Sequence, residues 1–560
     1  MVHLINGQTK YKVAALAQME ALFDPMRWPE WTDLVHDRFG RATLRTGMLA
    51  QDVAVAYDWL YQSLSVAERA SIVEGLNRRG IQPYLETLAQ DPWWTHDLNN
   101  WMTVIVGGFG IVGMVLGDEH PASERMVALA LEKMELYLQT YGQEGEFNES
   151  VGYGSANRLA VNFYQAHRYW SNGTKNRLSE APFPQMCEWG VRVSLPPGRD
   201  AGLGDAKPER ALRTGYMGSV AAATGDGVLQ DYFQQYHADT VDPYQVVSCR
   251  PGLAAVSPEG RWPRFKAYAE HGKIVVSRSD WDPRRAACIV YGKAGREKHH
   301  AHSDVGQVCI DGYGERLIVD LGSPSAYPAD YFDEGRHAYY NASVIGHNVL
   351  TFDLAEQAFP VRQRGEEVDM ELYCGRFLSY RDAGDLGAAW RMDLTRAYPG
   401  TERVRRTVWH GLPGYVAVLD EAEAGRRCDI ALRWHLAEAS EWSADGRFAV
   451  RRKEGAVSGW VMALDPEAPV KIRLGTHSYA TPYDRSSTGE PLEQRREPYI
   501  EAVMQAERCR WLTLFHVQPA REKRVTWEGG PGRWLCGEAS FELTAAGGSM
   551  VIGGCQLTPD

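Results

Sequence analysis

The sequence lacks the features that mark membrane, secreted and repetitive proteins. No stretch reaches the roughly 18 consecutive apolar residues that a bilayer-spanning helix needs, and the N-terminal segment has no apolar signal core. No internal repeat and no low-complexity segment is present. We therefore expect a soluble protein with no membrane partner, cytoplasmic as the sequence is written, or periplasmic or secreted if a signal peptide precedes it.

Cysteines are few and show no pairing pattern. Nine cysteines are spread over 560 residues, the number is odd, and none belongs to a Cys-x-x-Cys pair. This pattern is typical of free, buried thiols in a reducing compartment rather than of a disulfide framework.

The chain also has fewer basic than acidic residues. The chain has 60 Lys and Arg residues against 72 Asp and Glu, a net charge of -12. A nucleic-acid-binding protein usually carries a basic domain, so nucleic acid is not expected as a partner. The 44% of hydrophobic and 24% of charged residues are ordinary for a globular protein, and the length predicts two or more domains. The 18 tryptophans and 27 tyrosines suit sugar rings, but most are expected in cores.

The first 250 residues or so have the pattern of a helical domain. Ser65 and Glu68 form a capping box that starts one helix. Residues 126–142 carry helical periodicity. The segment 101–117 is apolar on every face and rich in glycine, which predicts a buried helix with close neighbours. We expect a stack of antiparallel helix pairs around a central buried layer.

After about residue 265 the pattern changes to short strands. Alternating or β-branched runs are punctuated by Gly, Pro and Asp at 273–281, 286–292, 305–320, 415–423 and 460–465. The tetrapeptide 311–314, Asp-Gly-Tyr-Gly, predicts a hairpin turn. Many strands without intervening helices indicate a large antiparallel sandwich, and the domain boundary is expected between 242 and 264.

The segment 295–307, GREKHHAHSDVGQ, carries the densest set of chemically active side chains. If it enters a strand, His300, His302 and Asp304 share one face, with His299 on the opposite face. Such a face could form a site. The alternative is an exposed, polar strand end, which is the more ordinary interpretation of an isolated His-x-His pair.

Two later residues favour a site. Asp320 ends an apolar strand, where a carboxylate is poorly placed unless it is paired or binds a metal. His347 is flanked by apolar residues. Two histidines and one aspartate make a competent set of zinc ligands, because neutral imidazole and carboxylate oxygen both suit zinc.

The helical half has polar clusters of its own. Asn99 and Asn100 precede the apolar helix, where such residues often serve only as helix caps. Residues 149–153 run from Glu149 to Tyr153 after a helix break, and Tyr153 could be an ordinary half-buried aromatic residue. Gly204 and Asp205 could form a turn.

Taken in chain order, these clusters resemble the heparinase II/III-like superfamily of polysaccharide lyases, which includes alginate and other uronate lyases. The order is Asn-Asn-Trp at 99–101, Glu-x-x-x-Tyr at 149–153, Gly-Asp at 204–205, His-x-His-x-Asp at 300–304, Asp-x-Gly at 320–322 and His-Asn at 347–348. The resemblance implies an incomplete α/α toroid over 1–250, a multi-layered antiparallel β-sandwich over 265–560, and an active site in the cleft between them.

The resemblance also assigns residues to roles. By motif position, Asn100 matches the asparagine that neutralises the substrate carboxylate, Tyr153 the catalytic tyrosine and His300 the catalytic histidine. One structural zinc ion would be bound by His302, Asp320 and His347.

The sequence departs from the superfamily pattern at two positions. Some members have a histidine where this chain has Trp101, and it is open whether His96 replaces it. Many members have an arginine where this chain has Asn341.

The activity implied by the resemblance is β-elimination at a (1→4)-linked uronate in a polysaccharide, which leaves 4,5-unsaturated uronate ends. If the C5 proton and O4 lie on the same face of the sugar, one tyrosine can act as base and acid; otherwise His300 is the base and Tyr153 the acid. A tyrosine base needs its pKa lowered from about 10. Lys293, Arg296 and Lys298 are candidate cations for this and for attracting an acidic polymer.

Several alternatives stay open. A glycosaminoglycan of the hyaluronan, chondroitin or heparan type is favoured as the substrate, with alginate or another polyuronate as the alternative. A glycoside hydrolase would need two carboxylates about 5–10 Å apart, for which Asp97 and Glu149 could be proposed. A metal-activated hydrolase and a non-catalytic sugar-binding protein on the same scaffold are further alternatives.

Overall fold

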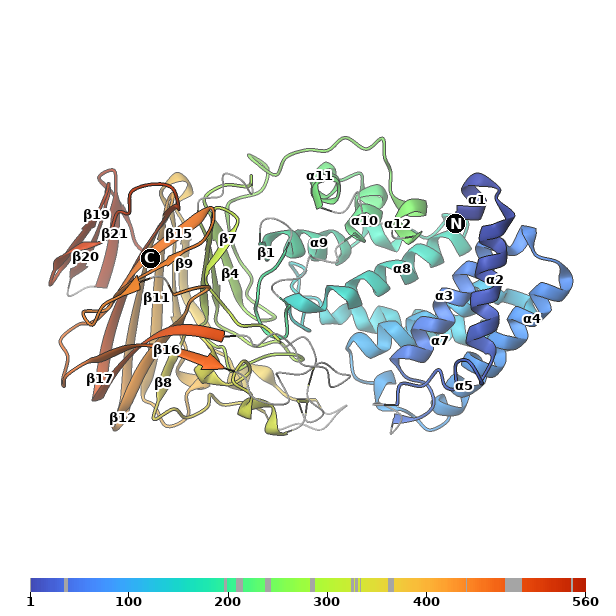
Figure 1. Cartoon of the computed structure of the whole chain (residues 1–560), viewed down its shortest axis with the longest axis horizontal. Coiled ribbons are helices and arrows are strands. Elements are labelled where there is room, and N and C mark those ends of the chain that lie inside the picture. Colours follow the sequence, from blue (N-terminus) through green and yellow to red (C-terminus); the bar gives the residue numbers. More distant parts are fainter. Residues whose placement is uncertain are drawn as a thin grey trace.

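The computed structural model places helices in one half of the chain and sheets in the other (Figure 1). It describes residues 2–34, 39–195, 199–207, 215–236, 243–282, 288–323, 327, 331–332, 334–360, 367–439, 441–478, 496–544 and 547–560. The last helix described in the N-terminal half ends at Ser248, and the first strand of the large sheets begins at Phe265.

The helical half is a succession of α-helices. They are α1 (Val2–Asn6), α2 (Thr9–Phe23), α3 (Leu44–Leu60), α4 (Val66–Leu76), α5 (Gln82–Leu88), α6 (Gly108–Leu116), α7 (Ser123–Tyr137), α8 (Gly154–Trp170), α9 (Phe183–Arg192), α10 (Met217–Thr224), α11 (Gly227–Tyr236) and α12 (Pro243–Ser248). The predicted capping box starts α4, since the Ser65 hydroxyl accepts from the Glu68 backbone N–H and the Glu68 carboxylate accepts from that of Ser65.

The apolar, glycine-rich segment lies at the centre of this half. The stretch Met102–Glu119 is long and apolar enough to cross a membrane by composition alone, but 78% of it is buried inside the protein. A Cβ on Gly113 would lie 2.7 Å from the Ser123 carbonyl oxygen, so the glycine permits close approach of α7. The predicted buried helix is therefore confirmed, and its environment is the protein core.

The C-terminal half consists of antiparallel sheets. The strands are β3 (Phe265–Ala267), β4 (Ile274–Arg278), β5 (Ile289–Lys293), β6 (Val308–Gly312), β7 (Glu315–Ile318), β8 (Leu350–Phe352), β9 (Arg376–Asp382), β10 (Gly387–Asp393), β11 (Arg403–Gly411), β12 (Tyr415–His435), β13 (Glu441–Trp442), β14 (Arg447–Arg451), β15 (Gly455–Ala463), β16 (Lys471–Ser478), β17 (Arg496–Pro519), β18 (Glu528–Gly530), β19 (Arg533–Cys536), β20 (Ala539–Thr544), β21 (Gly547–Ile552) and β22 (Cys555–Leu557). A further pair of two-residue strands, β1 (Ser194–Leu195) and β2 (Arg199–Asp200), lies between α9 and α10 in the helical half.

Three sheets are stacked to make the sandwich. A five-stranded sheet in the order β3-β4-β5-β6-β7 packs on a ten-stranded sheet through residues such as Val290 and Trp511. The opposite face of the ten-stranded sheet packs on the β18–β22 sheet through Trp409 and Phe541. The long strands β12 and β17 run antiparallel along the middle of the ten-stranded sheet. The predicted fold class, a helical domain followed by a multi-layered antiparallel sandwich, is confirmed.

Most strand predictions match the structure. The hairpin turn predicted at 311–314 joins β6 to β7, with Tyr313 and Gly314 both at positive φ. The strand predicted over 286–292 corresponds to β5, although its first two residues lie outside the described part of the chain, as does the start of the predicted domain boundary at 242. All nine cysteines are free.

The two halves share a buried interface. The outer face of the first sheet, including Val276 and Tyr291, belongs to the same apolar core as Trp189 of α9. The Tyr291 hydroxyl donates to the Ser194 carbonyl at 3.1 Å. The loops at one edge of this interface carry the predicted site residues.

Candidate active site and metal cluster

The loop between β5 and β6 is bound tightly to the helical half. The Lys298 backbone N–H donates to the Asn148 carbonyl at 3.0 Å, and the Asp205 N–H donates to the His300 carbonyl at 3.1 Å. Gly204 has φ +59°, and a Cβ there would lie 2.8 Å from the His300 carbonyl oxygen. Glycine is therefore required at 204, and His300, itself at φ +58°, is held against the helical half.

Tyr153 and His300 lie face to face. Tyr153 immediately precedes α8, and its ring stacks on the His300 imidazole with centroids 3.6 Å apart and planes 17° apart. Its hydroxyl lies 3.1 Å from the Tyr327 hydroxyl. The side chain of His300 is 13% exposed, so the pair borders solvent. Two predicted catalytic residues from different halves of the chain thus meet at the interface.

Asn100 joins the pair through Glu149. The Asn100 side-chain amide donates to Glu149 Oε1, and the same carboxylate oxygen lies 3.3 Å from His300 Nε2. The adjacent Asn99 is the helix cap, because its side-chain oxygen accepts from the Trp101 N–H at 2.9 Å. The Asn100 amide is therefore directed toward the predicted catalytic residues and does not cap the helix.

Asp205 connects the catalytic histidine to the rest of the site. Its Oδ2 lies 2.9 Å from His300 Nδ1, and its Oδ1 lies 2.9 Å from His302 Nε2. The Tyr331 hydroxyl and the Arg336 guanidinium each donate to it at 2.8 Å. Burial disfavours the charged carboxylate, but Arg336 and the two histidines hold its pKa well below the usual range.

The surroundings shift the pKa of both predicted catalytic residues. Burial raises the pKa of Tyr153 well above 10, and Tyr327, Asp205 and Glu149 add to the shift. Burial by itself lowers the pKa of His300, but the hydrogen bonds with Asp205 and Glu149 outweigh it, so the pKa lies above its usual 6.5. Tyr153 therefore rests as a neutral phenol.

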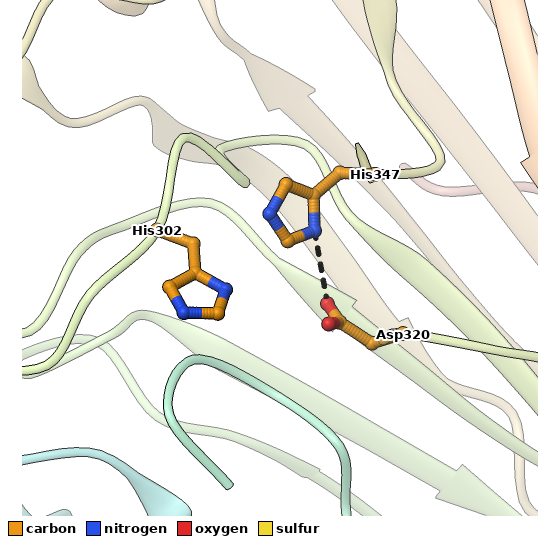
Figure 2. Close-up of side chains that lie close together, drawn as sticks. All are labelled: His302, Asp320 and His347. Atoms are coloured by element: carbon orange, nitrogen blue, oxygen red, sulfur yellow. Dashed lines mark hydrogen bonds and ion pairs between the residues drawn. The ribbon is translucent and has the colours of Figure 1, made fainter. Parts of the chain in front are cut away.

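His302, Asp320 and His347 form a buried cluster (Figure 2). One potential ligand atom from each lies within 4.8 Å of the others. His347 Nδ1 lies 3.2 Å from the Asp320 carboxylate, which also accepts from the Gln307 side chain at 2.9 Å. Burial disfavours the charged form of Asp320, but His347 and the other contacts lower its pKa to about 2.

The cluster has the chemistry of a metal site. His302 Nδ1 and His347 Nε2 are buried and have no hydrogen-bond partner among the described residues. Buried polar atoms are normally paired, so two free imidazole nitrogens beside an ionised carboxylate fit a cation. The three predicted ligands are therefore brought together in a geometry that suits a metal ion, although the geometry alone does not select zinc.

The strand predicted for the His-x-His-x-Asp motif is wrong. Residues 299–307 precede β6 as a loop. Asp304 forms a buried ion pair with Lys293 at 2.7 Å and does not face the histidines, while His299 Nε2 lies 3.3 Å from Asp97. His300 and His302 still reach a common partner, because both bind the Asp205 carboxylate.

The predicted role of the nearby cations is also wrong. Lys293 is fully buried between Glu297 and Asp304. Arg296 is buried, and its guanidinium donates to the His302 carbonyl oxygen and the Gln357 side chain. Lys298 pairs with Glu367 at 2.7 Å. Since the pKa of Tyr153 is raised, these cations do not prepare it as a resting base.

The departures from the superfamily pattern have structural explanations. Trp101 is buried against Trp93, with ring centroids 4.9 Å apart. His96 pairs with Asp91 at 2.6 Å and does not reach the predicted catalytic residues. The Asn341 amide donates to the Gly322 carbonyl and the Tyr331 hydroxyl.

The sequence did not predict the contacts that four residues make in this site. They are Glu149, which pairs with Asn100, Tyr327, which lies beside Tyr153, and Tyr331 and Arg336, which both donate to Asp205. By sequence, Glu149 was the first residue of the Glu-x-x-x-Tyr motif and one of two candidate hydrolase carboxylates, and Asp205 belonged to a Gly-Asp motif. The aromatic cluster at 327–332 was the available signal for Tyr327 and Tyr331. Arg336 had none, because its partner lies 131 residues earlier in the chain.

Comparisons with known proteins agree with the fold. Residues 270–528 match the family model "Heparinase II/III-like, C-terminal", and no curated protein sequence matches the chain. A heparinase III gene product is 12% identical with a TM-score of 0.68, covering 99% of this chain and 81% of that one. The heparan sulfate lyase HepC from Pedobacter heparinus is 14% identical with a TM-score of 0.62, covering 100% of this chain and 80% of that one.

These structural similarities extend over both halves of the chain, whereas the family model covers the sandwich half. At such low identity they establish the fold, and the family model independently identifies the sandwich. The predicted resemblance is confirmed: residues 270–528 match the heparinase II/III-like C-terminal family model, and the chain as a whole shares its fold with heparinase III.

Proposed function

We propose that this protein is a polysaccharide lyase that cleaves a (1→4)-linked uronate-containing polysaccharide by β-elimination. The observation that carries the proposal is the convergence of Asn100, Tyr153 and His300 at the interface of the two halves. Tyr153 stacks on His300 at 3.6 Å, and His300 and Asn100 meet at one Glu149 oxygen. An amide donor, a phenol and an imidazole can supply the charge stabilisation, the acid and the base that this reaction needs.

Asn100 would stabilise the charge that develops on the substrate. Removing the C5 proton of a uronate places negative charge on the adjacent carboxylate, and a fixed amide donor lowers the energy of that state. Glu149, which is buried, orients the amide through their hydrogen bond. The pairing of Asn100 and His300 with one carboxylate oxygen indicates that the two groups can also bind a carboxylate of the substrate.

His300 would be the base and Tyr153 the acid. The Asp205 carboxylate would accept a hydrogen bond from His300 Nδ1–H, which leaves Nε2 as the nitrogen that takes the C5 proton, as in other bases that a carboxylate orients. Tyr153 is partly buried, its pKa is raised well above 10, and its neutral hydroxyl can deliver a proton to the departing O4. Of the two assignments open from the sequence, the one that divides the work between His300 and Tyr153 fits this arrangement.

The cluster of His302, Asp320 and His347 would hold one zinc ion in a structural role. His302, Asp320 and His347 supply two nitrogens and one oxygen, and Zn–N distances near 2.0–2.1 Å are expected. When bound, the ion would cross-link three segments and so stabilise the loop that presents His300. Metal analysis of protein purified without chelator should find about one zinc per chain, and a chelator should lower the melting temperature. Stoichiometric zinc should be absent from His347→Ala, and its absence from the wild type would refute the assignment.

A glycosaminoglycan is the favoured substrate, with alginate or another polyuronate as the alternative. The similar solved structures are named heparinase III and heparan sulfate lyase. A hydrolase is less well supported, because Asp97 and Glu149 are both buried, and Asp97 lies against His299. Two carboxylates free to flank a glycosidic bond are therefore not found at these positions.

The deciding experiment is a screen of uronate polymers read by ultraviolet absorbance. Only elimination creates a C=C bond conjugated to the carboxylate, so absorbance rises if the protein is a lyase. Heparan sulfate, chondroitin sulfate, hyaluronan and alginate should be tested, with mass analysis of the products. Products heavier by one water and without absorbance would establish a hydrolase, and binding without products would establish a sugar-binding protein.

A further inference from the structure

An exposed aromatic ring lies directly beside the partly buried pair of Tyr153 and His300. Phe332 is 44% exposed, and its ring meets the edge of the His300 imidazole with centroids 5.4 Å apart at 89°. A large apolar side chain this exposed gains little from the protein core. Its position at the opening where His300 meets solvent gives it a surface that a ligand can cover.

A buried neighbour holds this ring in place. Tyr331 is fully buried, and its hydroxyl donates to the Asp205 carboxylate at 2.8 Å and accepts from the Asn341 amide at 3.0 Å. The Arg336 guanidinium lies 4.4 Å from the Tyr331 ring centre and 5.5 Å from that of Phe332. Phe332 is thus the direct neighbour of a residue that is hydrogen-bonded to Asp205 in the site.

A cation lies against the same aromatic cluster. Tyr327 packs against Phe332 with ring centroids 4.8 Å apart, and the Lys207 ammonium lies 5.5 Å from the Tyr327 ring centre. Tyr327 also contacts Tyr153 through their hydroxyl groups. The exposed Phe332 ring and the Lys207 ammonium therefore both lie next to Tyr327, whose hydroxyl contacts that of Tyr153.

We propose that Phe332 and Lys207 form a subsite for one sugar unit of the chain beside the bond that is cleaved. The ring face of Phe332 covers the C–H face of the sugar, and Lys207 pairs with its acidic group, a carboxylate or a sulfate. The inference rests on the proposed lyase function and adds the recognition of the neighbouring sugar unit. It assigns Phe332 and Lys207 to substrate binding and gives them no part in proton transfer.

The test separates KM from kcat on a defined oligosaccharide of the best polymer. Phe332→Ala should raise KM about tenfold, the factor that corresponds to about 1.4 kcal/mol, with kcat little changed. Phe332→Tyr should restore KM, and Phe332→Leu should not, because only an aromatic ring offers a flat face. Trp170→Ala is the matched control, since Trp170 is 52% exposed on α8 of the helical half. An unchanged KM for folded Phe332→Ala, or a fall in kcat alone, overturns the assignment of Phe332 to the subsite.

Lys207 is tested with two substrates. Lys207→Gln should raise KM, and Lys207→Arg should largely keep it. A penalty of similar size on hyaluronan and on chondroitin sulfate identifies a carboxylate as the partner, whereas a penalty confined to chondroitin sulfate identifies a sulfate. No change on either substrate removes Lys207 from the subsite.

The outcome is distinguishable from failure of the lyase proposal. If the wild type cleaves none of the polymers, the proposed function fails, and calorimetric binding of the same oligosaccharides to the wild type and Phe332→Ala then decides the subsite. Weaker binding by the variant supports the assignment of Phe332 to the subsite. Equal binding, or no binding by either protein, overturns it.

Discussion

Replacing Tyr153 by phenylalanine removes one hydroxyl and leaves the ring on His300. The hydroxyl contacts the Tyr327 hydroxyl at 3.1 Å, and loss of one such hydrogen bond costs about 0.5–1.5 kcal/mol of stability. The ring stack at 3.6 Å is kept. The variant should therefore fold, with a melting temperature slightly below that of the wild type.

The effect on rate should be much larger than the effect on stability. If the Tyr153 hydroxyl is the acid that protonates O4, its loss should lower kcat by about 10²–10⁴-fold. That range corresponds to about 2.7–5.4 kcal/mol in the activation barrier. The assay is the initial rate of ultraviolet absorbance on the best uronate polymer, with folding checked by thermal denaturation. His300→Ala should lower the rate by a similar factor.

Two controls separate the hydroxyl's chemistry from its hydrogen bond. Tyr327→Phe breaks the same hydrogen bond but keeps the Tyr153 hydroxyl, so it should lose far less activity. Tyr84→Phe removes a buried hydroxyl in the helical core, where the ring stacks on Phe109 at 4.0 Å, and should retain activity. Near-normal turnover by folded Tyr153→Phe, or an equal loss in Tyr327→Phe, would refute the assignment of Tyr153 as the acid.

Further outcomes test the neighbouring groups. Asn99→Ala should lower stability by about 0.5–2 kcal/mol and keep turnover, whereas Asn100→Ala should lower kcat at least about 10²-fold. Melting temperature and initial rate measure the two effects. If the two variants show the reverse effects, Asn100 is the helix cap. Because the pKa of Tyr153 lies well above 10, the acid stays protonated at alkaline pH, and kcat/KM should show no loss attributable to Tyr153 below pH 10; a falling limb below pH 10 that Tyr153→Phe abolishes would contradict this. Asp205→Ala leaves the buried Arg336 guanidinium without its carboxylate and should cost about 3–5 kcal/mol in denaturant unfolding; a loss below about 1 kcal/mol would show that the pair contributes little.

The sequence by itself indicated that a helical half precedes a β-sandwich half, and it supplied candidate catalytic residues and metal ligands. Local periodicity and capping are encoded by neighbouring residues, so the buried helix at 101–117, the start of α4 and the β6–β7 hairpin could be read directly. The motif order, by its resemblance to a superfamily, also singled out Asn100, Tyr153, His300 and the three potential metal ligands. The structure brings the ligands within 4.8 Å of one another and stacks Tyr153 on His300.

Only the tertiary structure decided the partners and protonation states of these residues. Whether Lys293 faces the cleft or an internal carboxylate depends on how β5 packs, and the structure places it in a buried ion pair. The contacts of Asp205 with His300 and of Glu149 with Asn100 join residues 95 and 49 positions apart. Hydrogen bonding and burial set a pKa, and both depend on these long-range contacts. For that reason the raised pKa of Tyr153, which favours the acid over the base among the two roles left open by the sequence, could not be foreseen from residue spacing.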